Sequence, residues 1–188
     1  NHGIEGETED AAILEDRSYT VKALLASLFL ANGTPMLLAG DEFGNSQQGN
    51  NNSYCQDNPI TWLDWQQADE ALQGYTRDLI RLRQEIKLLG DDVWWKQERV
   101  RWLNIQGEPM SELCWHNRGA KAMQIVLDDE WLLLINAKRS QQIFNLPQGS
   151  WQISCVPSEK FNYNADGKLT VEHMGIWILQ RKNTSPNI

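Results

Sequence analysis

Residues 34–65 read TPMLLAGDEFGNSQQGNNNSYCQDNPITWLDW, and the rest of the chain is organised around this stretch. It opens with a short apolar run, residues 36–39, between Pro35 and Gly40. A run of that length is typical of a strand buried on both faces, as in a parallel sheet. A loop rich in amides and glycines follows. In α/β architectures, binding groups lie on loops that leave the carboxyl ends of parallel strands, so we expect function here.

A helix is predicted before the apolar run, over residues 11–31. Acidic residues precede it, and negative charge suits a helix N-terminus because unpaired backbone N–H groups point outward there. Residues 23–31 are apolar almost all round, which indicates burial on more than one side. Gly33 can adopt a left-handed cap and Pro35 cannot continue the helix. The apolar positions predicted to line one face are Leu14, Val21, Leu24, Leu25 and Leu28.

A second helix is predicted to start near Asp64, with Gln67 as its capping-box partner. It carries an apolar stripe at three-four spacing, typical of an amphipathic helix with one buried face. Gly90 ends the pattern. The stripe consists of Leu72, Tyr75, Leu79, Leu82, Ile86 and Leu89.

A helix, a buried strand, a loop and a second helix thus follow one another. This order of elements is typical of an α/β barrel or a doubly wound sheet. A parallel strand needs neighbours on either side. Residues 1–90 contain only one good strand candidate, so we expect the missing strands in a longer parent chain upstream.

From residue 91 onward the pattern changes to short strand-like runs separated by turn signals. Regular short strands of this kind predict an antiparallel β-sandwich. The domain boundary therefore falls near residues 90–93. The predicted strands are residues 100–105, 122–127, 131–137, 142–146, 151–156, 168–172 and 175–180.

Composition narrows the functional classes. The chain has 188 residues, of which 41% are hydrophobic, and a net charge of −8. An acidic chain is a poor partner for nucleic acid, whose phosphates select basic surfaces. No signal peptide or membrane-length apolar run is present. Three widely spaced cysteines indicate reduced thiols in a cytoplasmic protein, and the three histidines form no metal-ligand pattern. The chain has nine tryptophans, a residue type that lies mainly in protein cores. Because an indole can also stack on a sugar ring, their number weakly favours a carbohydrate ligand.

Asp41 and Glu42 directly follow the predicted strand. Glycoside hydrolysis needs two carboxylates on either side of the scissile bond. Adjacent residues on an extended backbone point to opposite sides, so these two are poorly placed to act as that pair. One of them is expected to face a pocket while the other anchors the loop. A purely loop-anchoring role is at least as compatible with the sequence as substrate contact.

The amide-rich segment, residues 50–58, is a stronger candidate for binding. Amide side chains both donate and accept hydrogen bonds, which matches the vicinal hydroxyls of a sugar. Tyr54 offers a flat face for stacking. An ordinary asparagine-rich turn explains the composition about equally well, because Asn tolerates left-handed backbone. The candidate substrate-binding residues of the whole stretch are Asp41, Glu42, Asn50, Asn51, Asn52, Tyr54, Gln56 and Asp57.

Three segments of the sequence resemble the α-amylase superfamily, and more narrowly its isoamylase-type bacterial glycogen debranching enzymes. They read GTPMLLAGDE at residues 33–42, GNNNSYCQDN at 49–58 and TWLDW at 61–65. The opening NHGIEGET and the sequence LIRLR at residues 79–83 fit the same group. The resemblance covers essentially the whole chain. The second and third segments are specific, whereas LIRLR alone is common to the broad superfamily.

The resemblance implies that residues 1–90 are the last part of a (β/α)8 TIM barrel: the seventh helix, eighth strand and eighth helix. It implies that residues 91–188 are the C-terminal β-sandwich domain. The implied activity is retaining hydrolysis of α-1,6-glucosidic branch linkages in glycogen, limit dextrin or a maltooligosaccharide, without a cofactor or metal. The family's three catalytic carboxylates precede this chain, so no catalytic residue is expected here. The eight candidate residues map to the substrate-facing rim.

Two other interpretations remain open from the sequence. The chain could be a non-catalytic carbohydrate-binding or interaction module with a closed core of its own. It could also come from another superfamily member, such as a trehalose-releasing hydrolase or a branching enzyme, although the GNNN segment speaks against that. The all-round apolar residues 23–31 favour a portion of a larger barrel enzyme, because an open barrel segment exposes apolar faces.

Overall fold

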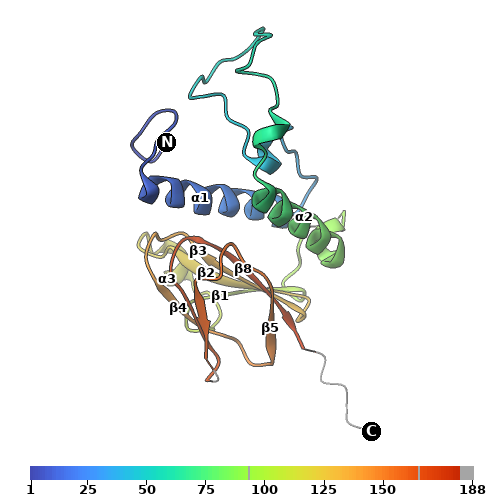
Figure 1. Cartoon of the computed structure of the whole chain (residues 1–188). Coiled ribbons are helices and arrows are strands. Elements are labelled where there is room, and N and C mark those ends of the chain that lie inside the picture. Colours follow the sequence, from blue (N-terminus) through green and yellow to red (C-terminus); the bar gives the residue numbers. More distant parts are fainter. Residues whose placement is uncertain (93, 165, 183–188) are drawn as a thin grey trace.

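Two helices form the first layer of the computed structural model, which describes residues 1–92, 94–164 and 166–182 (Figure 1). Helix α1 (Ala11–Leu30) begins at Asp10, whose Oδ1 accepts hydrogen bonds from the backbone N–H groups of Ala12 and Ile13 at 2.9 and 3.2 Å. The predicted helix is therefore confirmed to within one residue. Gly33 has φ +117°, in the left-handed region expected of it.

The buried face of α1 differs from the predicted one. Leu14, Val21 and Leu24 are exposed, and only Leu25 of the predicted set is buried. The residues that α1 buries against the second helix and the β-sandwich are Tyr19, Leu25, Ala26, Phe29 and Leu30. A helix that is apolar almost all round has no sequence signal that selects one face. Contacts with the second helix and the sheet make the selection, and the other apolar side stays exposed.

Helix α2 (Glu70–Glu85) begins later than predicted. Asp64 caps a short 3-10 helix, η2 (Trp65–Gln67), and its Oδ2 accepts a hydrogen bond of 2.8 Å from Gln67 Nε2. The cap was recognised correctly, but this short helix ends at Gln67, and Asp69 is the N-cap of α2. The apolar stripe is confirmed, since all six of its residues are buried. A 3-10 helix, η3 (Lys87–Gly90), follows.

The predicted strand over residues 36–39 is absent. Residues 36–39 have no strand assignment, and Met36 and Leu38 are 86% and 63% exposed rather than buried. A parallel strand exists only beside neighbours that satisfy its backbone groups, and the described part of the chain supplies none here. The segment instead leads through a turn into a single turn of 3-10 helix, η1 (Asp41–Phe43).

All seven predicted strands after residue 91 are present, each ending within two residues of its prediction. They are β1 (Val100–Leu103), β2 (Ala122–Leu127), β3 (Trp131–Asn136), β4 (Gln142–Asn145), β5 (Trp151–Cys155), β7 (Lys168–Val171) and β8 (Gly175–Arg181). The sequence did not indicate helix α3 (Glu112–His116) or strand β6 (Phe161–Tyr163), which are too short for a periodic pattern.

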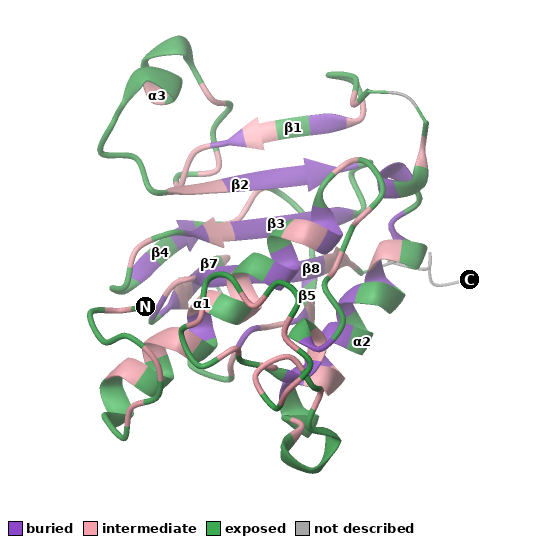
Figure 2. Cartoon of the chain, turned by 90° about the horizontal axis from the view of Figure 1, so that it is seen from above, coloured by how far each residue is buried: buried purple, intermediate pink, exposed green. Residues whose placement is uncertain are grey.

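The strands form two antiparallel sheets, with the orders β1-β2-β3-β8-β5 and β4-β7-β6. The predicted antiparallel β-sandwich is thus confirmed. The five-stranded sheet is the middle layer. Ile125, Leu133 and Ile178 belong to its core with the helices, while Val126 and Trp177 belong to its core with the smaller sheet. Because both faces are covered, β3 and β8 read as continuous apolar runs. Strands β1 and β2 extend beyond the helices (Figure 2).

His173 joins α1 to the sandwich. Its ring stacks on Tyr19 with centroids 3.6 Å apart. Its Nδ1 lies 2.8 Å from the carbonyl oxygen of Met174, which can only accept, so Nδ1 carries the proton. Nε2 then accepts from the Ser158 hydroxyl at 2.6 Å. Burial lowers the pKa of His173 below its usual value of 6.5. The neutral ring is therefore the form that fits this contact.

Stability is expected to depend on pH through His173. Its pKa is lower in the folded than in the unfolded chain, so the unfolded chain binds the proton first as pH falls. The neutral His173 ring contributes fully to stability above about pH 6.5, its pKa in the unfolded chain. This contribution is lost as pH falls from that value towards the lower pKa of the folded chain. Other charges near the ring are Glu15, Lys160 and Lys22.

The measurement is urea unfolding between pH 5 and 7.5 for the parent chain, His173→Gln and His116→Gln. His116 is exposed, so its variant is expected to keep the parent's pH dependence. His173→Gln is expected to flatten it. Equal pH dependence in all three proteins would contradict the assignment.

Candidate functional site

The turn after residue 39 is shaped by glycine. Gly40 and Gly44 flank η1 with φ values of +101° and +84°. A Cβ on Gly40 would lie 2.6 Å from Asn45 Cβ and 2.8 Å from Leu63 Cδ2, so no other residue fits without movement. This turn brings the chain back towards α2, where the carbonyl oxygen of Phe43 accepts a hydrogen bond from Asp69 N at 3.0 Å.

Asp41 and Glu42 have different surroundings on this turn. Glu42 Oε2 accepts a hydrogen bond of 2.8 Å from Gly40 N, so this carboxylate anchors the loop. Asp41 borders a shallow apolar hollow of about 370 Å³ beside Leu24 and Met36. Partial removal from water, and then the charge of Glu42, raise the pKa of Asp41. Asp41 is thus the one of the two placed beside a hollow, and the pair does not face one common space.

The amide-rich loop is ordered by its own side chains. Asn50 Oδ1 accepts from Asn52 N at 2.9 Å, and Gln56 Nε2 donates to the Asn52 carbonyl oxygen at 3.4 Å. Thr61 Oγ1 donates to the Gln56 carbonyl oxygen at 2.7 Å. The loop rises from the helix layer on the side away from the sheets (Figure 1). Asn51, Asn52 and Tyr54 are exposed, with Tyr54 at 85%.

A hollow of about 550 Å³ lies at the base of this loop, and we call it the rim hollow. Its lining is largely polar and comes from the N-terminal segment, the turn after η1 and the segment before α2. The lining side chains that can contact a ligand include Glu7, Asn45, Gln48, Trp62, Asp64 and Gln67. Trp62 is exposed, and its Nε1 donates a 2.7 Å hydrogen bond to Asp57 Oδ1, which fixes the indole.

None of the eight residues predicted from sequence lines the rim hollow. Asp57 reaches it indirectly by holding Trp62. Asn50, Asn51, Asn52, Tyr54 and Gln56 lie on the loop above it. The residues that sequence reasoning missed are Trp62 and the polar groups of the base. The tryptophan excess and the specific segment at residues 61–65 were signals for Trp62, but its contact with Asp57 depends on how the loop folds.

Asp64, a carboxylate in the lining of the rim hollow, is poorly suited to proton transfer. Both oxygens of Asp64 already accept hydrogen bonds, from Gln66 N and Gln67 Nε2, and these lower its pKa. That carboxylate stays ionised near neutral pH and is a poor proton donor. Throughout the described ranges, no three His, Cys, Asp or Glu side chains gather to hold a metal ion. Exposed aromatic faces with neighbouring amides match a polyhydroxylated ligand.

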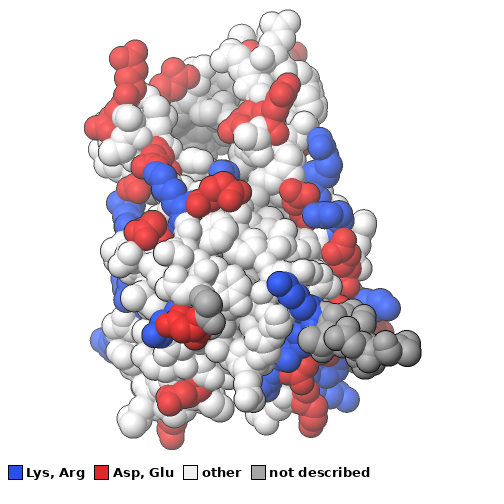
Figure 3. Space-filling view, turned by 60° about the horizontal axis from the view of Figure 1, so that its bottom comes forward, with Lys and Arg blue, Asp and Glu red and all other residues white. Residues whose placement is uncertain are grey.

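Surface charge and helix character bear on other partners. Acidic and basic side chains are interspersed on the face seen in Figure 3, around a largely uncharged middle. That face offers no continuous basic surface of the kind nucleic acid selects. Among the described helices, none combines the length and apolarity of a membrane span.

Comparisons with known proteins give consistent results. Residues 96–170 match the family model of the glycogen debranching enzyme C-terminal domain. A glycogen operon protein GlgX homolog of Haemophilus influenzae is 54% identical over 158 residues, covering 81% of this chain and 24% of the relative. A glycogen debranching enzyme of Dickeya chrysanthemi is 50% identical over 171 residues, covering 89% and 26%. The chain therefore spans about a quarter of the length of these curated relatives.

Among solved structures, the pullulanase of an Anoxybacillus species complexed with maltotriose superposes with a TM-score of 0.68. It is 16% identical and the superposition covers 94% of this chain and 24% of the pullulanase. At that identity the likeness concerns the fold alone.

Proposed function

Since this chain belongs with the bacterial glycogen debranching enzymes, we propose that the complete enzyme hydrolyses α-1,6-glucosidic branch linkages in glycogen or limit dextrin. The observation that carries the proposal is the 54% identity to a glycogen operon protein over 158 residues. The mechanism we propose is retaining, with its carboxylates upstream of residue 1. This chain supplies part of the substrate rim and the C-terminal sandwich. The unpaired thiols of all three cysteines suit the cytoplasm.

We further propose that residues 1–90 complete a (β/α)8 barrel and that residues 91–188 form the separate sandwich domain. The exposed apolar side of α1 supports this proposal. Val21, Leu24 and Met36 border the 370 Å³ hollow on that side, and Leu38 is exposed nearby in sequence. Contiguous exposed apolar surface on a soluble protein marks an interaction site. Upstream barrel segments would cover it and would give residues 36–39 their strand partners.

The rim hollow and the loop above it are the proposed glucan contacts. The eight residues proposed from sequence supply amides, carboxylates and Tyr54, and Trp62 adds a second aromatic face. Asp57 is a positioning residue because it holds the Trp62 indole. Asp41 and Glu42 shape the turn beneath them. Maltotriose in the related pullulanase fold supports an α-glucan as ligand, since that protein carries one in its crystal structure.

Replacing Tyr54 with alanine in the complete enzyme is expected to raise the KM for limit dextrin. An aromatic contact contributes about 0.5–1.5 kcal/mol beyond area burial, so the expected rise is roughly 2- to 12-fold. The fold should be unaffected because Tyr54 is almost fully exposed. Michaelis kinetics with circular dichroism check both statements. Tyr163→Ala, at an exposed tyrosine of β6, is the matched control. An unchanged KM in the Tyr54 variant would contradict the contact.

The proposed function is tested by assaying branch hydrolysis of glycogen limit dextrin by this 188-residue chain and by the chain extended upstream to the length of its relatives. Only the extended chain is expected to release linear oligosaccharides. If the short chain alone cleaves branches, Asp41, Glu42 and Asp57 become the catalytic candidates and the proposal is wrong in its placement of the carboxylates. Glucan binding by an extended chain without hydrolysis would favour a non-catalytic binding module.

A further inference from the structure

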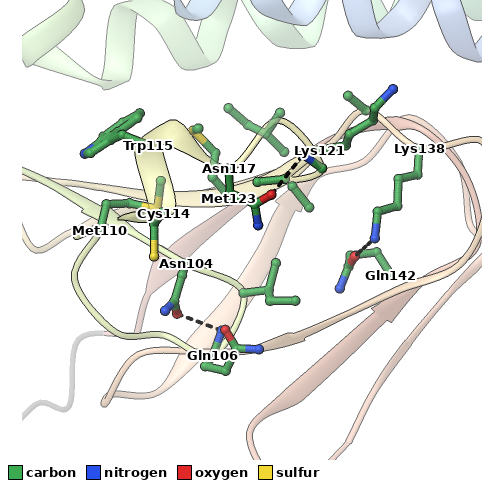
Figure 4. Close-up of a pocket in the computed structure, with 16 residues that line it drawn as sticks. Asn104, Gln106, Met110, Cys114, Trp115, Asn117, Lys121, Met123, Lys138 and Gln142 are labelled. Atoms are coloured by element: carbon green, nitrogen blue, oxygen red, sulfur yellow. Dashed lines mark hydrogen bonds between the residues drawn. The ribbon is translucent and has the colours of Figure 1, made fainter. Parts of the chain in front are cut away.

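A third cavity, of about 560 Å³, lies in the sandwich and shares no residue with the rim hollow. It forms beneath the loop that carries α3, beside the first residues of β2 and the last residues of β3 (Figure 4). We call it the sandwich cavity. Its lining includes Gln106, Met110, Trp115, Asn117, Met123 and Gln142.

The polar groups of the sandwich cavity are mostly amides. Its lining includes no Asp or Glu, although acidic residues outnumber basic ones by 25 to 17 in the chain. Within the described ranges, the side-chain amide of Gln106 and the Nδ2 of Asn117 make no hydrogen bond, so both are available to a ligand. Lys138 points into the cavity, where its Nζ donates to Gln142 Oε1 at 2.9 Å (Figure 4).

An aromatic and thioether surface completes the lining. Trp115 lies at the edge of the cavity and is 51% exposed. It meets Trp102 with ring planes at 65°, a contact that covers only part of an indole. Met110 and Met123 add flexible apolar contacts, and such side chains adapt to the shape of a ligand. Two basic side chains, Lys121 and Lys138, are the charged members of this lining. An apolar surface with a few converging polar groups is the usual composition of a ligand site.

We propose that the sandwich cavity binds an α-glucan chain at a second site of the enzyme, apart from the rim hollow. A glucose unit has apolar C–H faces that stack on an indole and hydroxyl groups that pair with amides, and the lining offers both. No lining carboxylate adds charge that a neutral polymer would leave unpaired. Two sites on one polymer make the second contact intramolecular and raise overall affinity. The proposal rests on the proposed function for the identity of the ligand.

The test uses the complete enzyme and measures its dissociation constant for glycogen by affinity electrophoresis. Trp115→Ala is expected to raise that constant about tenfold, a partial loss of the gain from two linked sites, and Gln106→Ala by a smaller factor. Trp94→Ala is the matched control, because Trp94 is 86% exposed and lies outside the cavity. We also compare activity on glycogen with activity on a short branched oligosaccharide. The ratio of the two is expected to fall for Trp115→Ala and to stay unchanged for Trp94→Ala.

Equal glycogen affinity of the Trp115 and Trp94 variants would overturn the proposal. So would a lower Tm of the Trp115 variant with unchanged glycogen affinity, because the cavity would then be filled by the rest of the enzyme. Debranching activity and binding are read separately. Trp115-dependent glycogen binding by an enzyme that cleaves no branches would support the second site and refute the proposed function. Branch cleavage by an enzyme whose glycogen binding does not depend on Trp115 would support the proposed function and refute the second site.

Discussion

Replacing Leu79 with alanine is expected to lower the free energy of unfolding of this chain by about 2–5 kcal/mol, the range for a leucine truncated in a core. Leu79 is 0% exposed in the middle of α2. It belongs to the core cluster that joins both helices to the five-stranded sheet. Its removal therefore leaves a cavity between layers, and the lost contacts add to the lost transfer free energy of the methyl groups.

The matched control is Ile80→Ala on the same helix. Ile80 is exposed, so truncation there removes little buried contact, and a change within about 0.5 kcal/mol is expected. Urea unfolding followed by tryptophan fluorescence measures both, with unchanged m-values as the sign that only stability has changed. If Leu79→Ala also stayed within about 0.5 kcal/mol, the α2 stripe would not be core.

Replacing Arg83 with lysine is expected to destabilise the chain by about 2–3 kcal/mol, since a hydrogen bond to a charged group contributes about 1.5–3 kcal/mol. The guanidinium donates to four backbone carbonyl oxygens. Those of Phe29, Ala31 and Leu89 lie at 2.7, 2.8 and 2.9 Å, and that of Gly33 completes the set.

These four carbonyls belong to the C-terminal end of α1, the bend after it and η3. Carbonyl groups at a helix end have no partner within the helix, and Arg83 satisfies them from α2. A lysine ammonium is a single point with three donors and cannot span this set. The variant therefore loosens the joint that ties the two helices together.

Arg81→Lys is the control for Arg83→Lys. Arg81 lies two residues earlier and its exposed side chain pairs with Asp78 at 3.3 Å. Exposed pairs of this type contribute at most about 1 kcal/mol, and the charge is kept, so no measurable change is expected. Thermal and urea unfolding of the two variants provide the comparison. Equal stability of both would mean that the Arg83 contacts are dispensable.

The second helix and the sandwich strands were predictable because their patterns are local. Leu72 to Leu89 repeat at the helical period, and all six stripe residues are buried. The strand from Ala122 to Leu127 matches its prediction at both ends. Turn signals between apolar runs fixed the remaining strands to within two residues, because Gly and Asn tolerate the left-handed backbone of turns, Pro fixes φ, and Asp hydrogen-bonds to the nearby backbone.

Other features depend on which elements meet. Asp64 and Asp69 both cap a helix, and only Asp64 has a capping-box partner in sequence, yet the path of the chain makes Asp69 the residue that starts α2. Residues 36–39 have the sequence of a buried strand but lie unpaired, because a strand is defined by partners outside itself. Of the candidate site, the sequence indicated the loop and its amides. The rim hollow beneath it unites residues from Glu7 to Gln67, which no local pattern connects.

The sequence alone indicates seven strands of the sandwich, the buried stripe of α2 and the relation to glycogen debranching enzymes. Each of these depends on short-range periodicity or on contiguous motifs. Only the tertiary structure decided which side of α1 is buried, that Asp57 holds Trp62, and that Trp115 borders a cavity with Met123 and Gln142. These are contacts between residues distant in the chain. Their free energy depends on burial and geometry that exist only once the layers have packed.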